Sequence, residues 1–437
     1  MSAVTTNTAA REDDVLDPGK ARQARIAGVA LILLSLLVLF VLDVEGGAMA
    51  TFKLARIKGE LPNLVVPGAP FNYAAGAVIA FLGVRQFLKG GGRWTSLSLG
   101  AGLFILVLAF LVWATAGKSF YLTGMLQATV VRAMPIALGG LAGVLCERVA
   151  VVNIAIEGML LAGAFTGALV GSLMGGWAGI GAAIIVGGVF GIMLAALVVT
   201  YRMDQIIAGT VINLFVLGVT SYVSSQVFQS HRALNNAPVF RAVKIPVLSD
   251  IPVIGPVLFQ QNIFVYGALI LVGVATYYLF YTKGGLRARA VGEHPRAADT
   301  LGIDVYKTRY FHVMLGGMVA GFGGAWFTLG SAGRFDENMT NGRGFIGLAA
   351  MIFGRWHPVG ALMAALVFGF ADSIQQKLAL GAPVWFGGRV TAPGAPISVS
   401  HRFSAGGNRR AVSDRPHGRT LYVPPRSVTA LIFSRRC

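Results

Sequence analysis

The feature that most constrains the fold is a series of apolar runs, each about 20 residues long, that recurs along most of the 437-residue chain. A run of this length crosses a hydrocarbon core about 30 Å thick as one helix. We predict spans at residues 26–42, 71–88, 97–116, 121–145, 149–173, 177–200, 205–228, 263–281, 310–330 and 359–379. The predicted fold is all-α, a polytopic integral membrane protein with about 10–11 transmembrane or re-entrant helices.

Composition and charge favour a membrane protein over a soluble one. Charged residues make up 12% of the chain, whereas soluble domains carry roughly 25%. The net charge of +18 could indicate nucleic-acid binding in a soluble protein. Basic cytoplasmic loops explain it better here, because Lys and Arg set the orientation of membrane helices. We therefore expect the lipid bilayer, and no nucleic acid, as a partner.

The distribution of basic residues predicts a cytoplasmic N-terminus. In that orientation the densest basic loop, residues 283–309, lies inside, and the long loops 43–70 and 229–261 lie outside. The first apolar run is expected to be a membrane anchor rather than a cleaved signal peptide, because a long polar segment with several acidic residues precedes it.

A shorter apolar run, residues 345–353, cannot cross a bilayer as an ordinary span. Glycines flank it and Pro358 follows it, and both residue types break helices. It is either a re-entrant half-helix beside the substrate path or part of a short helical hairpin. Within the predicted span 149–173, Gly163, Gly167 and Gly171 form a ladder of small residues that allows another helix to approach closely.

Polar residues inside the spans are the candidates for a translocation path. Asn153 and Glu157 are four residues apart and are expected to share a helix face. A carboxylate inside a span is costly unless it meets a cavity, a partner or water. Glu157 therefore either lines the path or pairs with a neighbouring helix or a freed backbone N–H. Asn213 and Phe345 complete the candidate path. Asp372 lies near a span end and is expected to be solvated.

No catalytic or metal site is expected. The six histidines are scattered without metal-ligand spacing. Gly117-Lys118-Ser119 is similar to the end of a phosphate-binding loop, but Val112 occupies the position of the first glycine that such a loop requires. We therefore expect a chain that is not an enzyme and that binds no cofactor itself.

The character of the sequence changes after residue 383. Residues 384–437 contain nine arginines, one aspartate and no apolar run near about 20 residues. This basic tail is either a native disordered extension or a frame-shifted translation that replaced a final helix. We favour the second interpretation.

The basic loop 283–309 carries a further pattern. Its residues follow an order typical of a short helix, a turn and a docking face: Gly292, Glu293, Ala297, Ala298, Gly302 and Ile303. Three other segments are distinctive: ERVAVVNIAIEGMLLAGAF, DQIIAGTVINLFVLGVTSY and NGRGFIGLAAMIFGRWHPVGALMAALVFGFAD. Together they make residues 120–383 resemble the permease core of type II ABC importers for nucleosides and simple sugars. Residues 1–119 then form a cytoplasmic tail and three additional spans.

The resemblance implies a mechanism and a set of partners. Two permease subunits, identical or different, form a path in the bacterial plasma membrane. Separate ABC ATPase subunits bind ATP-Mg and dock on the coupling loop, and an extracytoplasmic solute-binding protein delivers a small neutral polar solute. Alternating access follows as ATP-driven motion passes through residues 297–303. Glu293 would contact the ATPase or cap the short helix.

Two other classes of protein remain as alternatives. An ion-coupled secondary transporter needs intramembrane coupling groups, and Glu157 and Asp372 are sparse candidates for that role. A polytopic membrane enzyme or scaffold would need clustered His, Asp or Glu at a membrane face. The residues do not specify which solute is carried.

Overall fold

The computed structural model describes residues 18–44, 47–54, 62–89 and 93–381. The chain divides into the units Met1–Ala382 and Pro383–Cys437, and the second, with the basic tail and its two interpretations, lies outside the described residues. Within the described part, ten helices are long and apolar enough to cross a membrane. They coincide with the ten predicted spans, which confirms the all-α, polytopic prediction.

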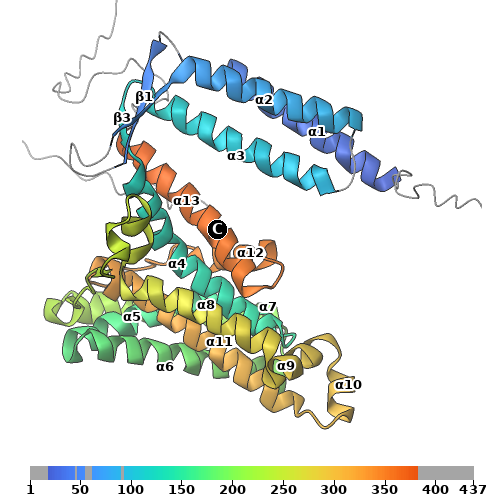
Figure 1. Cartoon of the computed structure of the whole chain (residues 1–437). Helices are drawn as coiled ribbons and strands as arrows, with labels where there is room; N and C mark the ends of the chain where they lie inside the picture. Colours follow the sequence, from blue (N-terminus) through green and yellow to red (C-terminus); the bar gives the residue numbers. More distant parts are fainter. Residues whose placement is uncertain (1–17, 45–46, 55–61, 90–92, 382–437) are drawn as a thin grey trace, which may run out of the picture. The chain divides into compact units, whose positions relative to one another are not determined.

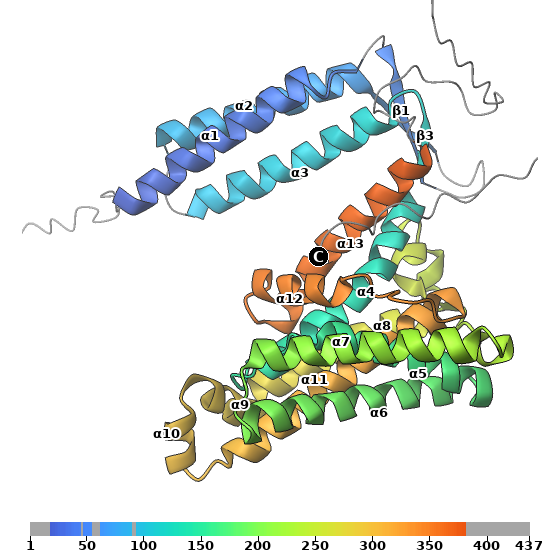
Figure 2. The same cartoon turned by 180° about the vertical axis from the view of Figure 1, so that it is seen from behind.

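The first three spans pack against one another (Figures 1 and 2). They are α1 (Pro18–Phe40), α2 (Gly68–Lys89) and α3 (Arg93–Thr115). Glycines let α1 and α2 approach closely: a Cβ added at Gly28 would lie 2.9 Å from the carbonyl oxygen of Gly83. Leu31 and Ile79 are fully buried between these helices.

A small sheet, which was not predicted from the sequence, joins the loop after α1 to the segment before α4. Strand β1 (Met49–Lys53) pairs antiparallel with β2 (Leu64–Pro67) and parallel with β3 (Ser119–Tyr121). The strands have three to five residues, so their alternation of side chains is too short to be recognised in the sequence.

The centre of the remaining bundle is α4 (Leu122–Glu147). In an apolar 18-residue segment of α4, 89% of the residues are buried, whereas 28% are buried in the corresponding segments of α7 and α13. The helices that contact α4 are α5 (Ile156–Met174), α8 (Ile263–Tyr281), α11 (Val305–Phe327), α12 (Arg343–Phe353) and α13 (Pro358–Gly381). Two further spans, α6 (Gly176–Ala195) and α7 (Gln205–Val223), pack on α5. π-Helical turns extend α6, α7 and α11: η3 (Ala196–Thr200), η4 (Ser224–Phe228) and η8 (Thr328–Ala332).

Glycines hold α5, α6 and α11 together at short range. A Cβ at Gly163 of α5 would lie 2.4 Å from the carbonyl oxygen of Gly321 on α11, and a Cβ at Gly321 would lie 2.1 Å from that of Ala183 on α6. A Cβ at Gly171 would lie 2.8 Å from Leu329. The predicted ladder on α5 is therefore a helix-packing surface, as small residues in membrane helices usually are.

The connections between the later spans are ordered. The loop from α7 to α8 contains η5 (Arg232–Asn235), β4 (Val243–Lys244), η6 (Leu248–Asp250), η7 (Gly255–Phe259) and β5 (Gln260–Gln261). Two short helices, α9 (Lys283–Glu293) and α10 (Pro295–Thr300), connect α8 to α11. Helix α12 has 11 residues and is about 16 Å long, roughly half a bilayer core. A turn joins it to α13, as the interpretation as a helical hairpin predicts. A re-entrant position beside the substrate path stays a prediction.

Candidate translocation path and coupling surface

Glu157, in the first turn of α5, holds the N-terminus of α12. Its side chain is 9% exposed, and its two carboxylate oxygens accept hydrogen bonds from the backbone N–H groups of Gly342 at 2.8 Å and Gly344 at 2.6 Å. The first N–H groups of a helix lack intrahelical partners, and the helix dipole favours an anion there. The carboxylate pairs with freed backbone N–H groups, one of the two interpretations left open by the sequence.

Asn213 of α7 holds the other side of the same turn. Its Oδ1 accepts from the N–H of Gly158 at 2.7 Å, and its Nδ2 donates to the carbonyl oxygen of Ile154 at 2.9 Å. A Cβ at Gly158 would lie 2.9 Å from that Oδ1, so only glycine permits this approach. Side chains from α5 and α7 thus fix three segments, α5, α7 and α12, around one point.

Three of the four predicted path residues line one cavity of about 330 Å³. Glu157, Asn213 and Phe345 meet there with Thr210 and Asn338, and the remaining wall is largely apolar. We call this space the Glu157 cavity. The structure therefore confirms that Glu157 pairs with freed backbone N–H groups and places it beside a cavity. That this cavity belongs to the translocation path stays a prediction.

Asn153 lies elsewhere, and the prediction that it shares a helix face with Glu157 is wrong. Helix α5 begins at Ile156, so Asn153 lies in the non-helical connection after α4. It is fully buried, and its Nδ2 contacts the sulfur atoms of Cys146 at 3.4 Å and Met159 at 3.6 Å. The break was hidden because apolar residues fill this buried connection as they would fill a span.

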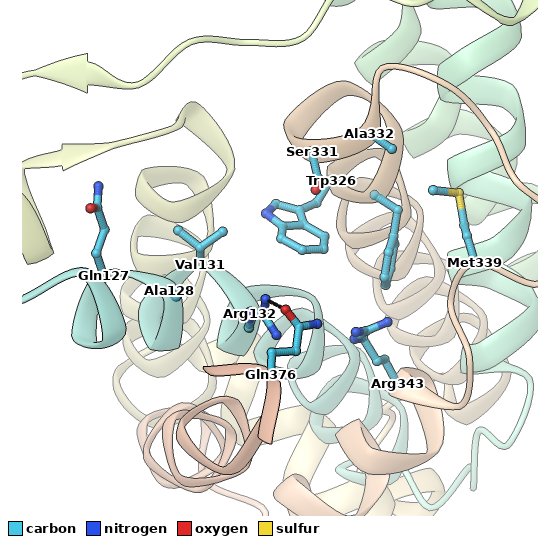
Figure 3. A pocket seen from close by; sticks show the side chains of 12 residues that line it. Gln127, Ala128, Val131, Arg132, Trp326, Ser331, Ala332, Met339, Arg343 and Gln376 are labelled. Atoms are coloured by element: carbon cyan, nitrogen blue, oxygen red, sulfur yellow. Dashed lines mark hydrogen bonds between the residues drawn. The ribbon is translucent and has the colours of Figure 1, made fainter. Parts of the chain in front are cut away.

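A second cavity, of about 470 Å³, is lined by Arg132, Arg343, Gln376, Trp326 and other residues (Figure 3). We call it the arginine cavity. These residues are not among the predicted site residues. Asp372, which was expected to be solvated, keeps 28% of its side chain exposed but also pairs with two of the arginines. Asp372 Oδ2 lies 3.4 Å from Nη1 of Arg132 and 3.6 Å from Nη2 of Arg343. A signal was present: Arg132 is a basic residue inside the predicted span 121–145, and such residues commonly mark sites.

The N-terminus of α12 lies between the two cavities. Gly342 and Phe345 line the Glu157 cavity, whereas Arg343 lines the arginine cavity. Residues that are neighbours in the sequence thus face two separate spaces. A movement of this helix end would change both cavities together, which makes the bond to Glu157 central to the site.

The predicted coupling loop forms α9, α10 and a turn, which connect the C-terminal end of α8 to the N-terminal end of α11 (Figures 1 and 2). Ala298 is 2% exposed and Ile303 packs on the core, so these two residues fix α10 to the bundle. Ala297 and Glu293 are exposed. Gly302 ends the helix with φ +79°, a conformation that favours glycine.

Glu293 does not cap α10. The N-cap position is His294, and no side-chain hydrogen bond caps the helix there. Of the two roles considered for Glu293, capping is therefore wrong, and contact with a partner remains a prediction.

Helix α9 contacts the α4–α5 turn, which is itself bonded to the α12–α13 turn. A Cβ at Gly292 would lie 2.3 Å from the carbonyl oxygen of Arg148, in the α4–α5 turn. The Arg148 guanidinium donates two hydrogen bonds, at 2.7 and 3.0 Å, to the carbonyl oxygen of Trp356 in the α12–α13 turn. Arg148 and Arg289 both lie over the ring of Phe280, at 5.4 and 5.2 Å from its centroid. Contacts thus run continuously from α9 to α12.

Two charged residues of the coupling loop act on Arg148 in opposite directions. Burial lowers the pKa of Arg148, the nearby charge of Arg289 lowers it further, and Glu293 opposes both effects. Trp356 also donates its indole N–H to Glu147. Polar bonds therefore fix the α12–α13 turn to the end of α4.

Comparison with known proteins identifies the family. The family described as "Branched-chain amino acid transport system / permease component" matches residues 125–388. The chain belongs to this permease family. It is a multi-pass membrane subunit of the ABC importer type and a transport component rather than an enzyme.

Several curated relatives are similar over the same region. The guanosine ABC transporter permease protein NupQ of Bacillus subtilis is 42% identical over 256 residues, which cover 56% of this chain and 80% of that protein. The nucleoside ABC transporter permease protein NupC of Lactococcus lactis is 39% identical, over 55% of this chain and 78% of that protein. The glucose ABC transporter permease protein TsgB13 of Haloferax volcanii is 27% identical, over 59% and 71%. No solved structure matches this chain.

Proposed function

We propose that this chain is the permease subunit of an ATP-driven importer that carries a small neutral polar solute, a nucleoside or a simple sugar. The observation that carries the proposal is the position of the α12 N-terminus between two cavities, held there by Glu157. The names of the relatives support the solute class. Alternating access follows if this helix end opens one cavity at a time.

The proposed orientation has the N-terminus in the cytoplasm of a bacterial cell. It places α9 and α10, with the basic residues of loop 283–309, on the cytoplasmic side of the plasma membrane. The loop between α7 and α8 then faces outward, where an extracytoplasmic solute-binding protein can deliver the solute.

The proposed partners are ABC ATPase subunits and a second permease subunit, identical or different. ATP-Mg is bound by the ATPase, which docks on the exposed side of α10 near Glu293 and Ala297. Closure of the ATPase pair moves α10 and α9. Because Gly292 lies against Arg148, and Arg148 is bonded to Trp356, that motion reaches the α12–α13 hairpin.

Purification of the full chain in mild detergent tests this proposal. An ATPase subunit and a second permease subunit should co-elute in stoichiometric amounts. Glu293→Arg should abolish co-elution of the ATPase while the chain still inserts, because it reverses an exposed charge beside α10. The matched control is Glu337→Arg, also at an exposed glutamate but in the segment before α12. A wild-type chain that elutes alone, or undiminished co-elution of Glu293→Arg, contradicts the assignment.

A transport assay tests the ATP-driven mechanism. Uptake that survives removal of ATP but stops when the ion gradient is collapsed would contradict it.

A further inference from the structure

The two guanidinium groups of the arginine cavity differ in how fully they are hydrogen-bonded. Arg132 is engaged: Nη1 donates to the carboxylate and the carbonyl oxygen of Asp372, both at 3.4 Å, and Nη2 donates to the side-chain oxygen of Gln376. Arg343 is not. Among the described residues its polar contacts are an ion pair at 3.6 Å with Asp372, longer than a hydrogen bond, and a cation–π contact at 5.6 Å from the ring centroid of Phe327.

Arg343 therefore presents unused donors to the cavity. An arginine carries five N–H donors in a planar fork, and no hydrogen bond from the Arg343 side chain occurs within the part of the chain that the structure describes. Its side chain is 23% exposed. Figure 3 shows Arg343, Gln376, Arg132 and Trp326 around the same space, with Gln376 and Arg132 between Arg343 and the indole of Trp326 in this view.

The rest of the lining adds the indole donor of Trp326 and two side chains, Gln127 and Ser331, that can both donate and accept. Trp326 is 6% exposed, and its indole N–H has no hydrogen-bond partner among the described residues. The carboxylate of Asp372 is shared by two arginines, so one positive charge is left over in this cluster. The cavity thus suits a ligand that is rich in acceptors and carries no cation.

The shape of the donor fork narrows the ligand class. Paired N–H donors of arginine match two adjacent acceptors in one plane, as in the O6 and N7 edge of a 6-oxopurine. A 6-aminopurine places a donor where O6 would be, and the flexible hydroxyls of a sugar lack such an edge. The volume of about 470 Å³ lies within the range of roughly 300–1,000 Å³ for small-molecule sites.

We propose that the arginine cavity is a solute subsite in which Arg343 binds the O6/N7 edge of a 6-oxopurine nucleoside by paired hydrogen bonds. The importer then prefers such nucleosides over 6-aminopurine nucleosides and over sugars. This inference rests on the proposed function and adds the residue that sets specificity.

Uptake by the complete importer in proteoliposomes tests the inference. Wild-type protein should take up inosine with a lower half-saturating concentration than adenosine. Arg343→Lys keeps the charge but loses the planar fork. It should raise the half-saturating concentration for inosine about 10- to 100-fold and leave that for adenosine unchanged. Arg334→Lys, at an exposed arginine outside this cavity, is the matched control and should change neither.

A second measurement needs no variant and so does not depend on the folding of Arg343→Lys. In 7-deazainosine a carbon replaces N7, so this solute should bind the wild-type importer about tenfold more weakly than inosine. ATP-driven uptake without any preference among inosine, 7-deazainosine and adenosine would overturn the inference while leaving the proposed function intact. Competition by inorganic phosphate but not by inosine would also overturn it, since the cavity would then be an anion site. Absence of all ATP-driven uptake would overturn both proposals.

Discussion

Replacement of Glu157 by glutamine isolates the contact that holds α12 in place. The native carboxylate accepts one backbone N–H on each oxygen, at 2.8 and 2.6 Å. Glutamine keeps one acceptor oxygen but turns an NH₂ group toward the second N–H, so one bond is lost and one buried donor is left unpaired. Hydrogen bonds to a charged group contribute about 1.5–3 kcal/mol each. We expect local opening of the α12 N-terminus to become easier by about 2–3 kcal/mol.

Hydrogen exchange measures this opening directly. With a factor of ten for each 1.36 kcal/mol, the amides of the first turn of α12 should exchange about 30- to 150-fold faster in Glu157→Gln. The assay is hydrogen exchange with mass spectrometry on protein in lipid nanodiscs. Glu337→Gln removes a charge from an exposed site in the segment before α12 and should leave exchange unchanged. Equal protection of α12 in Glu157→Gln and wild type would refute the argument.

Three further predictions concern packing, helix capping and coupling. Gly321→Leu forces a side chain into the α6–α11 contact and should lower the thermal midpoint by several degrees or prevent insertion. Gly218→Leu should do neither, because a Cβ added at Gly218 would have no neighbouring atom within 4 Å. Asp304 caps α11, and its bonds to Lys307 lower its pKa. The stabilising effect of this cap is thus complete above the ordinary aspartate pKa of about 4 and is lost as the pH falls through the lower pKa of the folded protein. The thermal midpoint of Asp304→Asn should therefore depend less on pH, under acidic conditions, than that of the wild-type protein. Arg148→Gln should leave the complex with ATPase activity but little uptake, while Arg287→Gln, at an exposed site, should retain both.

The ten spans could be predicted from the sequence because each depends on local composition alone. A run of apolar residues of membrane length has one stable conformation in a bilayer, since every backbone group must bond within the segment. The short run before Pro358 was also recognised from local composition, because it is apolar but too short for an ordinary span. The connection between α4 and α5 was predicted to be shorter than it is, with the next span starting at residue 149 rather than at Ile156, because most of its residues are as apolar as those of a helix.

The candidate site was predictable in part. Glu157 stood out because a carboxylate in a span must be satisfied somewhere. Its partners could not be named, since they are backbone groups 185 and 187 residues later in the chain, and a backbone N–H has no signature in the sequence. Arg132 and Asp372 are 240 residues apart, so only the fold shows that they pair and that Arg343 joins them.

Uptake by the reconstituted importer tests the central claim most directly. Proteoliposomes would contain this chain together with the ATPase and second permease that co-purify with it, and the solute-binding protein would be added outside. We expect labelled nucleoside to accumulate against its gradient only when ATP is supplied to the ATPase side, and we expect Glu157→Gln to reduce this accumulation. Accumulation without ATP that follows an imposed ion gradient would contradict this claim.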